Sequence, residues 1–264
     1  MSKKTTGSFI YISILFVCIL SCEQAFEPLN ENIGFYSVYG YLDSGAGESL
    51  IRINNMNKPL IEGDSSPFDG IVTLEHLDSG LKETLVDSLI YFNGIATHNF
   101  KYEMPLSDGS DYLLTVENAE GNGIELSTRT PNRINEVTYE PAVEDNRGCG
   151  NFLLSFYPVD SGGILLEITL DVAGTEVVWQ ERIRTLIVDN RINLGVSFRE
   201  IGRALSRGDV TYCSRMFGNT VKFKYSHLNQ DLLEERIDET IRIPGGLSRF
   251  GALYSEKFEL QFNF

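Results

Sequence analysis

The stretch Phe35-Tyr36-Ser37-Val38-Tyr39-Gly40-Tyr41-Leu42-Asp43 (residues 35–43) carries the pattern that decides the fold. Aromatic and β-branched side chains crowd this short run with a period of two residues, which is typical of a β-strand. The turn-forming residues Asp43, Ser44 and Gly45 end the run. We therefore predict a strand here, at the beginning of a folded body that starts at Gly34.

Runs of the same kind recur along the first half of the chain. Turn residues such as Asn93-Gly94 and Asp108-Gly109 separate them, and helical periodicity does not intervene. The predicted strands of this half are residues 35–42, 50–53, 71–77, 84–86, 97–104, 112–117 and 124–130. Short strands at this spacing are typical of a β-sandwich.

The segment MPLSDGSDYLLTV, residues 104–116, resembles the penultimate strand of fibronectin-III-like and related immunoglobulin-like domains. The resemblance implies that Tyr112, Leu114 and Val116 point into the core. It also implies that the Tyr112 hydroxyl bonds to the backbone in a tyrosine corner. The alternative interpretation is an ordinary exposed strand tyrosine.

The second half is also predicted to be rich in strands, with small helical insertions. Phe198, Ile201 and Leu205 recur with helical spacing between residues 196 and 206. The predicted strands are residues 152–157, 164–172, 176–187, 221–225, 240–243 and 257–262. The predicted fold class is therefore mainly β: an immunoglobulin/fibronectin-III-like β-sandwich over residues 34–131, followed by a second β-rich domain over residues 132–264.

The N-terminus has the features of an export signal. Lys3 and Lys4 precede an apolar stretch, residues 9–20, that only Ser13 interrupts. This stretch is too short for a comfortable membrane span, which needs roughly 20 apolar residues. A short buried helix is the alternative interpretation.

Ile19-Leu20-Ser21-Cys22 resembles the bacterial lipobox. That resemblance implies a thioether-linked diacylglycerol on Cys22, and two or three acyl chains hold a protein at a membrane where one does not. We predict a lipoprotein signal peptide over residues 1–21 and an acidic tether over residues 22–33. The alternative is an ordinary secretory signal with an incidental cysteine.

The charge of the chain excludes one class of partner. The formal net charge is −15, and removal of residues 1–21 takes away two lysines and no acid, which leaves −17. Such a surface repels nucleic acid, so we expect no DNA or RNA binding.

Cys149 and Cys213 are the two cysteines that remain if Cys22 is acylated. Disulfides persist outside the cytoplasm, so these two cysteines are a candidate disulfide pair. Two free thiols are the alternative. The cysteines lie far apart in sequence, without a CxxC motif or a nearby histidine, so a zinc site is not expected.

The sequence lacks the motifs of a hydrolase. It has no G-x-S-x-G, and only His76, His98 and His227 could act as histidine bases. All three lie on predicted strands or at their ends, where histidines are usually structural. We expect no enzymatic activity, no metal and no cofactor.

A cluster of arginines is the one local departure from acidity. Arg199, Arg203 and Arg207 recur every four residues on the predicted helix and would line one face. Arginine pairs with carboxylates in a bidentate way, so this face is a candidate for binding an acidic partner or an anionic glycan. A solvated helix face, or pairing with the protein's own acids, is the alternative.

The chain as a whole resembles the DUF4249 lipoproteins of Bacteroidota. The resemblance rests on Cys22 followed by Glu23, on the run at 35–43, on the immunoglobulin-like half, and on IPGGLSRFGALY at residues 243–254. It implies a cell-envelope lipoprotein without an established activity, commonly associated with TonB-dependent outer-membrane receptors. Only Cys22 is implied as a functional residue.

These observations lead to two functional expectations. The first is an outer-membrane lipoprotein, facing the periplasm or the cell surface, that acts by binding as an accessory of an envelope transport or surface complex with a β-barrel receptor. The second is a fimbrillin-like adhesin or filament subunit. It would need a groove for strand donation, for which the end of the chain, residues 258–264, is the expected place.

Overall fold

The structure of the protein is a computed structural model. It describes residues 35–45, 50–57, 65–141, 151–159, 162–172, 174–183, 187–206, 217–229, 232, 241–243 and 246–261. All of them lie in one compact unit, Gly34–Phe264. The elements are β1 Tyr36–Asp43, β2 Leu50–Asn55, β3 Gly70–His76, β4 Leu81–Thr84, β5 Val86–Phe92, β6 Ile95–Lys101, β7 Asp111–Asn118, β8 Gly123–Arg129, β9 Glu136–Pro141, β10 Asn151–Tyr157, β11 Gly163–Val172, β12 Thr175–Ile183, β13 Ile192–Ser197, α2 Phe198–Ser206, β14 Phe217–Leu228, β15 Ile241–Ile243 and β16 Gly246–Gln261.

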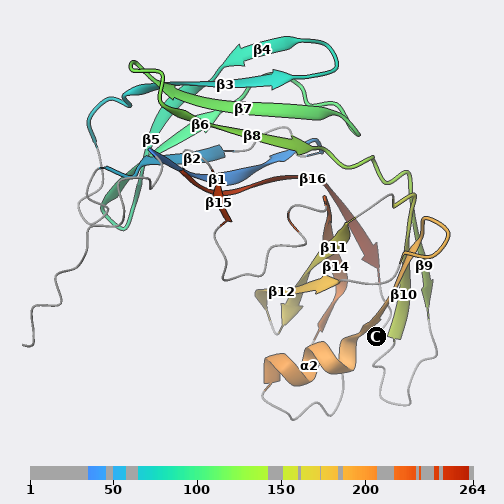
Figure 1. Ribbon diagram of the computed structural model, residues 1–264. Helices are drawn as coiled ribbons and strands as arrows, with labels where there is room; N and C mark the ends of the chain where they lie inside the picture. The colour runs from blue at the N-terminus through green and yellow to red at the C-terminus, as the bar shows by residue number, and fades with distance from the viewer. Residues whose placement is uncertain are drawn as a thin grey trace, which may run out of the picture. The chain divides into compact units, whose positions relative to one another are not determined.

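Strands β1 to β8 form the first sandwich (Figure 1). One sheet has the order β1-β2-β6-β5 and the other the order β4-β3-β7-β8. This is the immunoglobulin-like arrangement with β4 as an additional edge strand beside β3: β1, β2, β5 and β6 face β3, β7 and β8. The alternation along β1 places Tyr36, Val38 and Leu42 in the core, each at most 1% exposed. The predicted mainly β, immunoglobulin-like fold is confirmed.

Tyr112 is the second residue of β7 and forms the predicted tyrosine corner. Its ring is 1% exposed, and Leu114 and Val116 are fully buried on the same side of the strand. The backbone N–H of Ser107 donates a hydrogen bond of 2.7 Å to its hydroxyl oxygen. Burial raises the pKa of Tyr112. The alternative of an exposed strand tyrosine is wrong.

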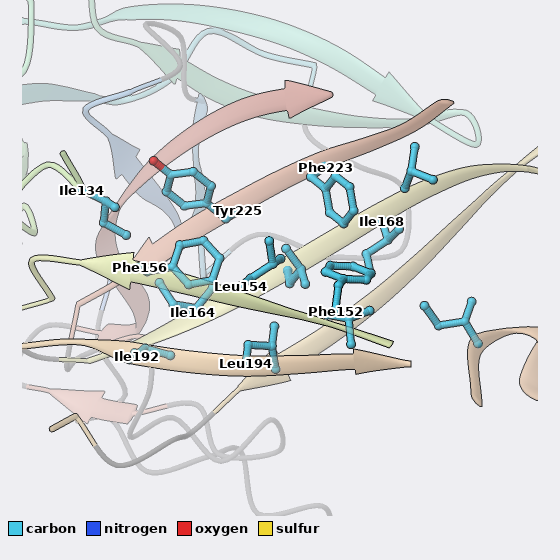
Figure 2. Packing of buried hydrophobic residues seen from close by; sticks show 14 of the residues in the cluster. Ile134, Phe152, Leu154, Phe156, Ile164, Ile168, Ile192, Leu194, Phe223 and Tyr225 are labelled. Atoms are coloured by element: carbon cyan, nitrogen blue, oxygen red, sulfur yellow. The ribbon is translucent and has the colours of Figure 1, made fainter. Parts of the chain in front are cut away.

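Strands β9 to β14, with part of β16, form a second sandwich of the same connectivity. The sheet β13-β10-β9 faces the sheet β12-β11-β14-β16. Figure 2 shows their shared core, in which Phe152, Phe156, Phe223 and Tyr225 pack with aliphatic residues of β11 and β13. The predicted helix is α2, which follows β13 and buries Phe198 and Ile201. The second β-rich domain is thus itself a sandwich with one helical insertion in the described residues.

Strand β16 contributes to both sandwiches. Its first half, from Gly246 to Leu253, runs parallel to β1, and its second half, from Leu253 to Gln261, runs antiparallel to β14. Phe250 and Ala252 are part of the first core, and Tyr254 is part of the second. The sequence analysis placed all of these residues in the domain over 132–264. The structure adds that a strand near the C-terminus covers the edge of β1.

A buried carboxylate fixes the point at which β16 passes from one core to the other. Asp43, at the end of β1, is 4% exposed. Its carboxylate accepts hydrogen bonds from the Ser255 N–H (3.0 Å), from the Ser255 hydroxyl and from the Gly45 N–H (2.9 Å). Asn229, directly after β14, is bonded to the first sandwich: its Nδ2 donates to Thr128 Oγ1 on β8 (2.9 Å). The first and last described strands are therefore tied together by polar contacts as well as by pairing.

Candidate binding surface

The outer face of the sheet that contains β1 gathers aromatic and arginine side chains. Residues directly opposite one another on paired strands lie on the same face. Arg249 on β16 is opposite Tyr39 on β1, Tyr39 is opposite Arg52 on β2, and Arg52 is opposite Asn99 on β6. We call the surface around this row the aromatic–arginine face. Its residues are Tyr39, Gly40, Tyr41, Leu50, Arg52, Phe92, Asn99, Leu232 and Arg249.

The period of two residues explains why these side chains share a face. On β1 the core takes Val38 and Leu42, so the intervening Tyr39 and Tyr41 project to the other side. Tyr39 is 37% and Tyr41 45% exposed, which is unusually open for strand tyrosines next to a core. The same alternation buries Ile51 and Ile53 on β2 and places Arg52 outward.

The face is hollowed, with a volume of about 420 Å³. Inside it the guanidinium carbon of Arg52 lies 4.5 Å from the centroid of the Phe92 ring, which is a cation–π contact. The ring therefore holds the guanidinium in one orientation. Arg52 Nε is shielded from solvent and has no hydrogen-bond partner in the described part of the protein. Such a donor is stabilised when an acceptor arrives.

The composition of the face is that of a recognition surface. Tyrosine, arginine and other aromatic residues are enriched at the energetic centres of interfaces. Among the described residues, two arginines and no carboxylate line the hollow, although the chain carries a net charge of −15. Leu50 and Phe92 add exposed apolar area, at 45% and 47%.

The predicted arginine cluster lies elsewhere, on α2. Arg199 is half-buried and Arg203 exposed, while Arg207 falls outside the described residues. Neither described guanidinium forms an ion pair with another described residue. Phe198 and Ile201 anchor the opposite side of the helix in the core, so the four-residue spacing is also what an amphipathic helix requires. Partner binding by these arginines stays a prediction.

The predicted lipidation site Cys22 and the predicted disulfide cysteines, Cys149 and Cys213, lie outside the residues that the structure describes. The signal peptide and tether lie outside them as well. The described ranges contain no helix with the length and apolar character needed to cross a bilayer. The anchor and the disulfide therefore stay predictions.

The three histidines have structural contacts. His98 Nδ1 lies 2.7 Å from Asp87 Oδ2, beside the Phe68 ring and 4% exposed. His227 is fully buried, with Nδ1 3.0 Å from the Asn132 carbonyl oxygen. His76 bonds to Ser79 within a single turn. None of the three lines the aromatic–arginine face.

The described side chains also do not converge on a metal. Among them, no three His, Cys, Asp or Glu residues come together in a way that could hold an ion. The expectation that the protein is not an enzyme is not tested by these contacts and stays a prediction.

Sequence reasoning did not identify the aromatic–arginine face. Tyr39 and Tyr41 were quoted as strand formers, and Arg52, Phe92 and Arg249 were not singled out. The available signal was an outward-facing aromatic residue next to a strand arginine in an acidic chain. Their convergence depends on which strands become neighbours, and a sequence read segment by segment does not contain that information.

Comparisons with known proteins give no assignment. No protein-family model matches the chain, and no curated protein does. A pullulanase from an Anoxybacillus species is 13% identical, with a TM-score of 0.26, over 73% of this chain and 24% of that one. The tandem repeat of a large adhesion protein is 14% identical, with a TM-score of 0.24, over 86% and 49%. A cytokine receptor complex is 9% identical, with a TM-score of 0.29, over 86% and 95%.

The chain spans about a quarter of the length of the pullulanases that it matches. TM-scores this low carry no argument about function, so the function has to be argued from the described residues.

Proposed function

We propose that the protein is a lipid-anchored binding protein of the cell envelope, which serves as an accessory of an outer-membrane transport or surface complex. It contacts its partner through the aromatic–arginine face. The observation that carries this proposal is the gathering of Tyr39, Tyr41, Phe92 and two arginines on one solvent-exposed sheet face. The lipobox at Cys22 supports the location.

The scaffold suits a binding role. Two sandwiches share the strand β16, and the pairing of β16 with β1 holds Arg249 beside Tyr39. A face built on paired strands keeps its side chains in fixed positions, so little conformational entropy is lost when a partner binds. The polar contacts of Asp43 add a second constraint on the same pair of strands.

Membrane attachment is tested by changing Cys22 to alanine. Two or three acyl chains anchor a protein stably, at about 0.8 kcal/mol for each buried methylene group. The Cys22→Ala variant should therefore lose radiolabelled palmitate and move from the membrane to the soluble fraction. A variant that still takes up the label and stays in the membrane would contradict the lipoprotein assignment.

The binding role is tested by photo-crosslinking in native membranes. A photoreactive amino acid at Tyr39 should yield a discrete adduct with an outer-membrane protein, identified by mass spectrometry as a β-barrel receptor. The matched control is Tyr91, which is 62% exposed but does not line the hollow. Equal adducts from both positions, or none from Tyr39, would argue against the proposal.

The edge of β16 keeps the adhesin or filament alternative open. The Ala252 carbonyl accepts from the N–H of Asn229, directly after β14, and the next carbonyl, that of Leu253, accepts from the N–H of Ser44, directly after β1. The two strands that pair with β16, β14 and β1, therefore lie along opposite edges of β16. Past Ser255, no described strand pairs with the edge on the β1 side.

A donated strand from another subunit could pair with this edge. Filaments of the purified protein in electron micrographs, absent from a variant with proline at Glu259, would favour the alternative. Monomers only, under the same conditions, would count against it.

A further inference from the structure

We propose that the aromatic–arginine face recognises an acidic protein segment, in which two carboxylates flank an apolar side chain. Arg52 and Arg249 bind the carboxylates, and Tyr39, between them, packs against the apolar group. This inference rests on the proposed function and names the chemistry of its partner.

The spacing of the two arginines sets the geometry of the partner. Arg249, Tyr39 and Arg52 are directly opposite one another on three adjacent strands. Neighbouring strands lie about 4.8 Å apart, so the two arginine Cα atoms are separated by about 10 Å with a tyrosine between them. One carboxylate cannot reach both positions equally, whereas two carboxylates on an extended segment can.

The charge of the hollow favours an acidic occupant. Among the described residues, no carboxylate lines it, and none forms an ion pair with Arg52. Lys101 lies opposite Leu50 on the same face, in the next row of residues. The described lining of the hollow therefore carries positive charge in a chain whose net charge is negative.

Arg52 is prepared for bidentate pairing. The Phe92 ring fixes the plane of the guanidinium, so less rotamer freedom is lost when a carboxylate binds. The Nε–H has no acceptor among the described residues, and a carboxylate that bonds along the guanidinium edge would supply one. A lysine could not reproduce this geometry, because its ammonium group is a point charge.

The apolar rim distinguishes a protein segment from a glycan. Leu50 is 45% exposed, and Val86, which also pairs opposite Lys101, is 70% exposed. These aliphatic groups extend the face beyond the tyrosine rings. They match apolar side chains of a protein, whereas a sugar presents hydroxyl groups around its ring and would leave them uncovered.

The test uses the full-length protein in detergent and peptides displayed densely on a biosensor surface. In the extended peptide Glu-Ser-Leu-Ser-Glu, both carboxylates and the leucine lie on one side. The matched peptide Gln-Ser-Leu-Ser-Gln removes only the charges. We expect the first peptide to bind, the second to bind roughly tenfold more weakly, and added salt to reduce the difference.

Variants locate the contact. Arg52→Gln and Arg249→Gln should each weaken binding of the acidic peptide by about tenfold, and Arg52→Lys should restore only part of it. Arg129→Gln, on an exposed arginine of β8 in the opposite sheet, is the matched control and should bind like the unchanged protein. Circular dichroism confirms that each variant is folded, and the two arginines provide independent tests if one variant does not fold.

Three results would overturn the inference. The acidic and amide peptides could bind equally, or Arg129→Gln could weaken binding as much as Arg52→Gln. Polygalacturonate could bind in an Arg52-dependent way while the acidic peptide does not, which would identify an anionic glycan as the occupant. If a Tyr39 crosslink to a receptor persists alongside any of these results, the proposed function stands and only the acidic chemistry is refuted.

Discussion

Replacing Asp43 with alanine is expected to destabilise both sandwiches, although the residue lies on a strand of the first. Its buried carboxylate receives hydrogen bonds from the N–H and hydroxyl groups of Ser255, which belongs to the second half of β16. The substitution removes the acceptor and leaves the Ser255 backbone N–H, in a residue only 5% exposed, without a partner.

The magnitude follows from the number of bonds lost. A hydrogen bond to a charged group contributes about 1.5–3 kcal/mol, and an orphaned buried donor costs about 1–3 kcal/mol. Gly45 is an exposed residue, so water can replace the hydrogen bond of its N–H at little cost. We therefore expect Asp43→Ala to lower the free energy of unfolding by about 3–4 kcal/mol. Asp43→Asn retains an acceptor oxygen, and the Ser255 hydroxyl can accept from the new amide, so about half that loss is expected.

The assay uses the only tryptophan of the chain, Trp179, which packs against the second core. Urea unfolding is followed both by Trp179 fluorescence and by far-ultraviolet circular dichroism. If β16 couples the two cores, Asp43→Ala shifts both transitions together. Asp111→Ala is the control, because the Asp111–Arg129 pair is exposed and contributes at most about 1 kcal/mol. An unchanged Trp179 transition in Asp43→Ala would refute the coupling.

Three further predictions concern the core. Tyr112→Phe removes the bond to the backbone and should lower the free energy of unfolding by about 1 kcal/mol in urea titrations, whereas Tyr91→Phe, on an exposed ring, should have no measurable effect. Phe250→Ala should cost about 3–5 kcal/mol by the same measurement, because the ring is part of the first core; a loss below 1 kcal/mol would mean that β16 does not complete that core. Burial, with a nearby carboxylate, raises the pKa of Tyr36 and of Tyr254 to about 12. The unfolded chain therefore loses these protons at a lower pH than the folded protein, so the free energy of unfolding should fall as the pH rises from about 10 to about 12. An ultraviolet titration in which every tyrosine of the folded protein ionises near pH 10 would contradict this prediction.

Several local features could be predicted because they depend on near neighbours in the sequence. The period of two residues in β1 identified a strand, and the spacing of Phe198 and Ile201 identified α2. The tyrosine corner was also recognisable, because Ser107 and Tyr112 are separated by only five positions along the chain. In each case one face of a short segment has to be buried, and the sequence records which residues form that face.

The candidate site could not be predicted in the same way. Arg52 and Phe92 are 40 positions apart, and Arg249 is almost 200 positions from Arg52. Nothing in their immediate surroundings marks them, since an arginine that alternates with buried isoleucines is common on an outward strand face. The arginines that the sequence did mark, on α2, follow the spacing of an amphipathic helix.

The sequence by itself determined most of the strands, the helix and the immunoglobulin-like character of the first half, because hydrophobic periodicity and turn residues act over a few positions. It did not identify β9 and β13, and it predicted only residues 84–86 where β4 and β5 lie. Only the tertiary structure decided that the last described strand first runs parallel to β1, where it completes the first core, and then continues into the second core. Parallel pairing of segments some 200 residues apart depends on which sheet edge remains uncovered after the sandwiches form, and local sequence does not encode that edge. The same pairing places Arg249 beside Tyr39, so the aromatic–arginine face exists only in the folded chain.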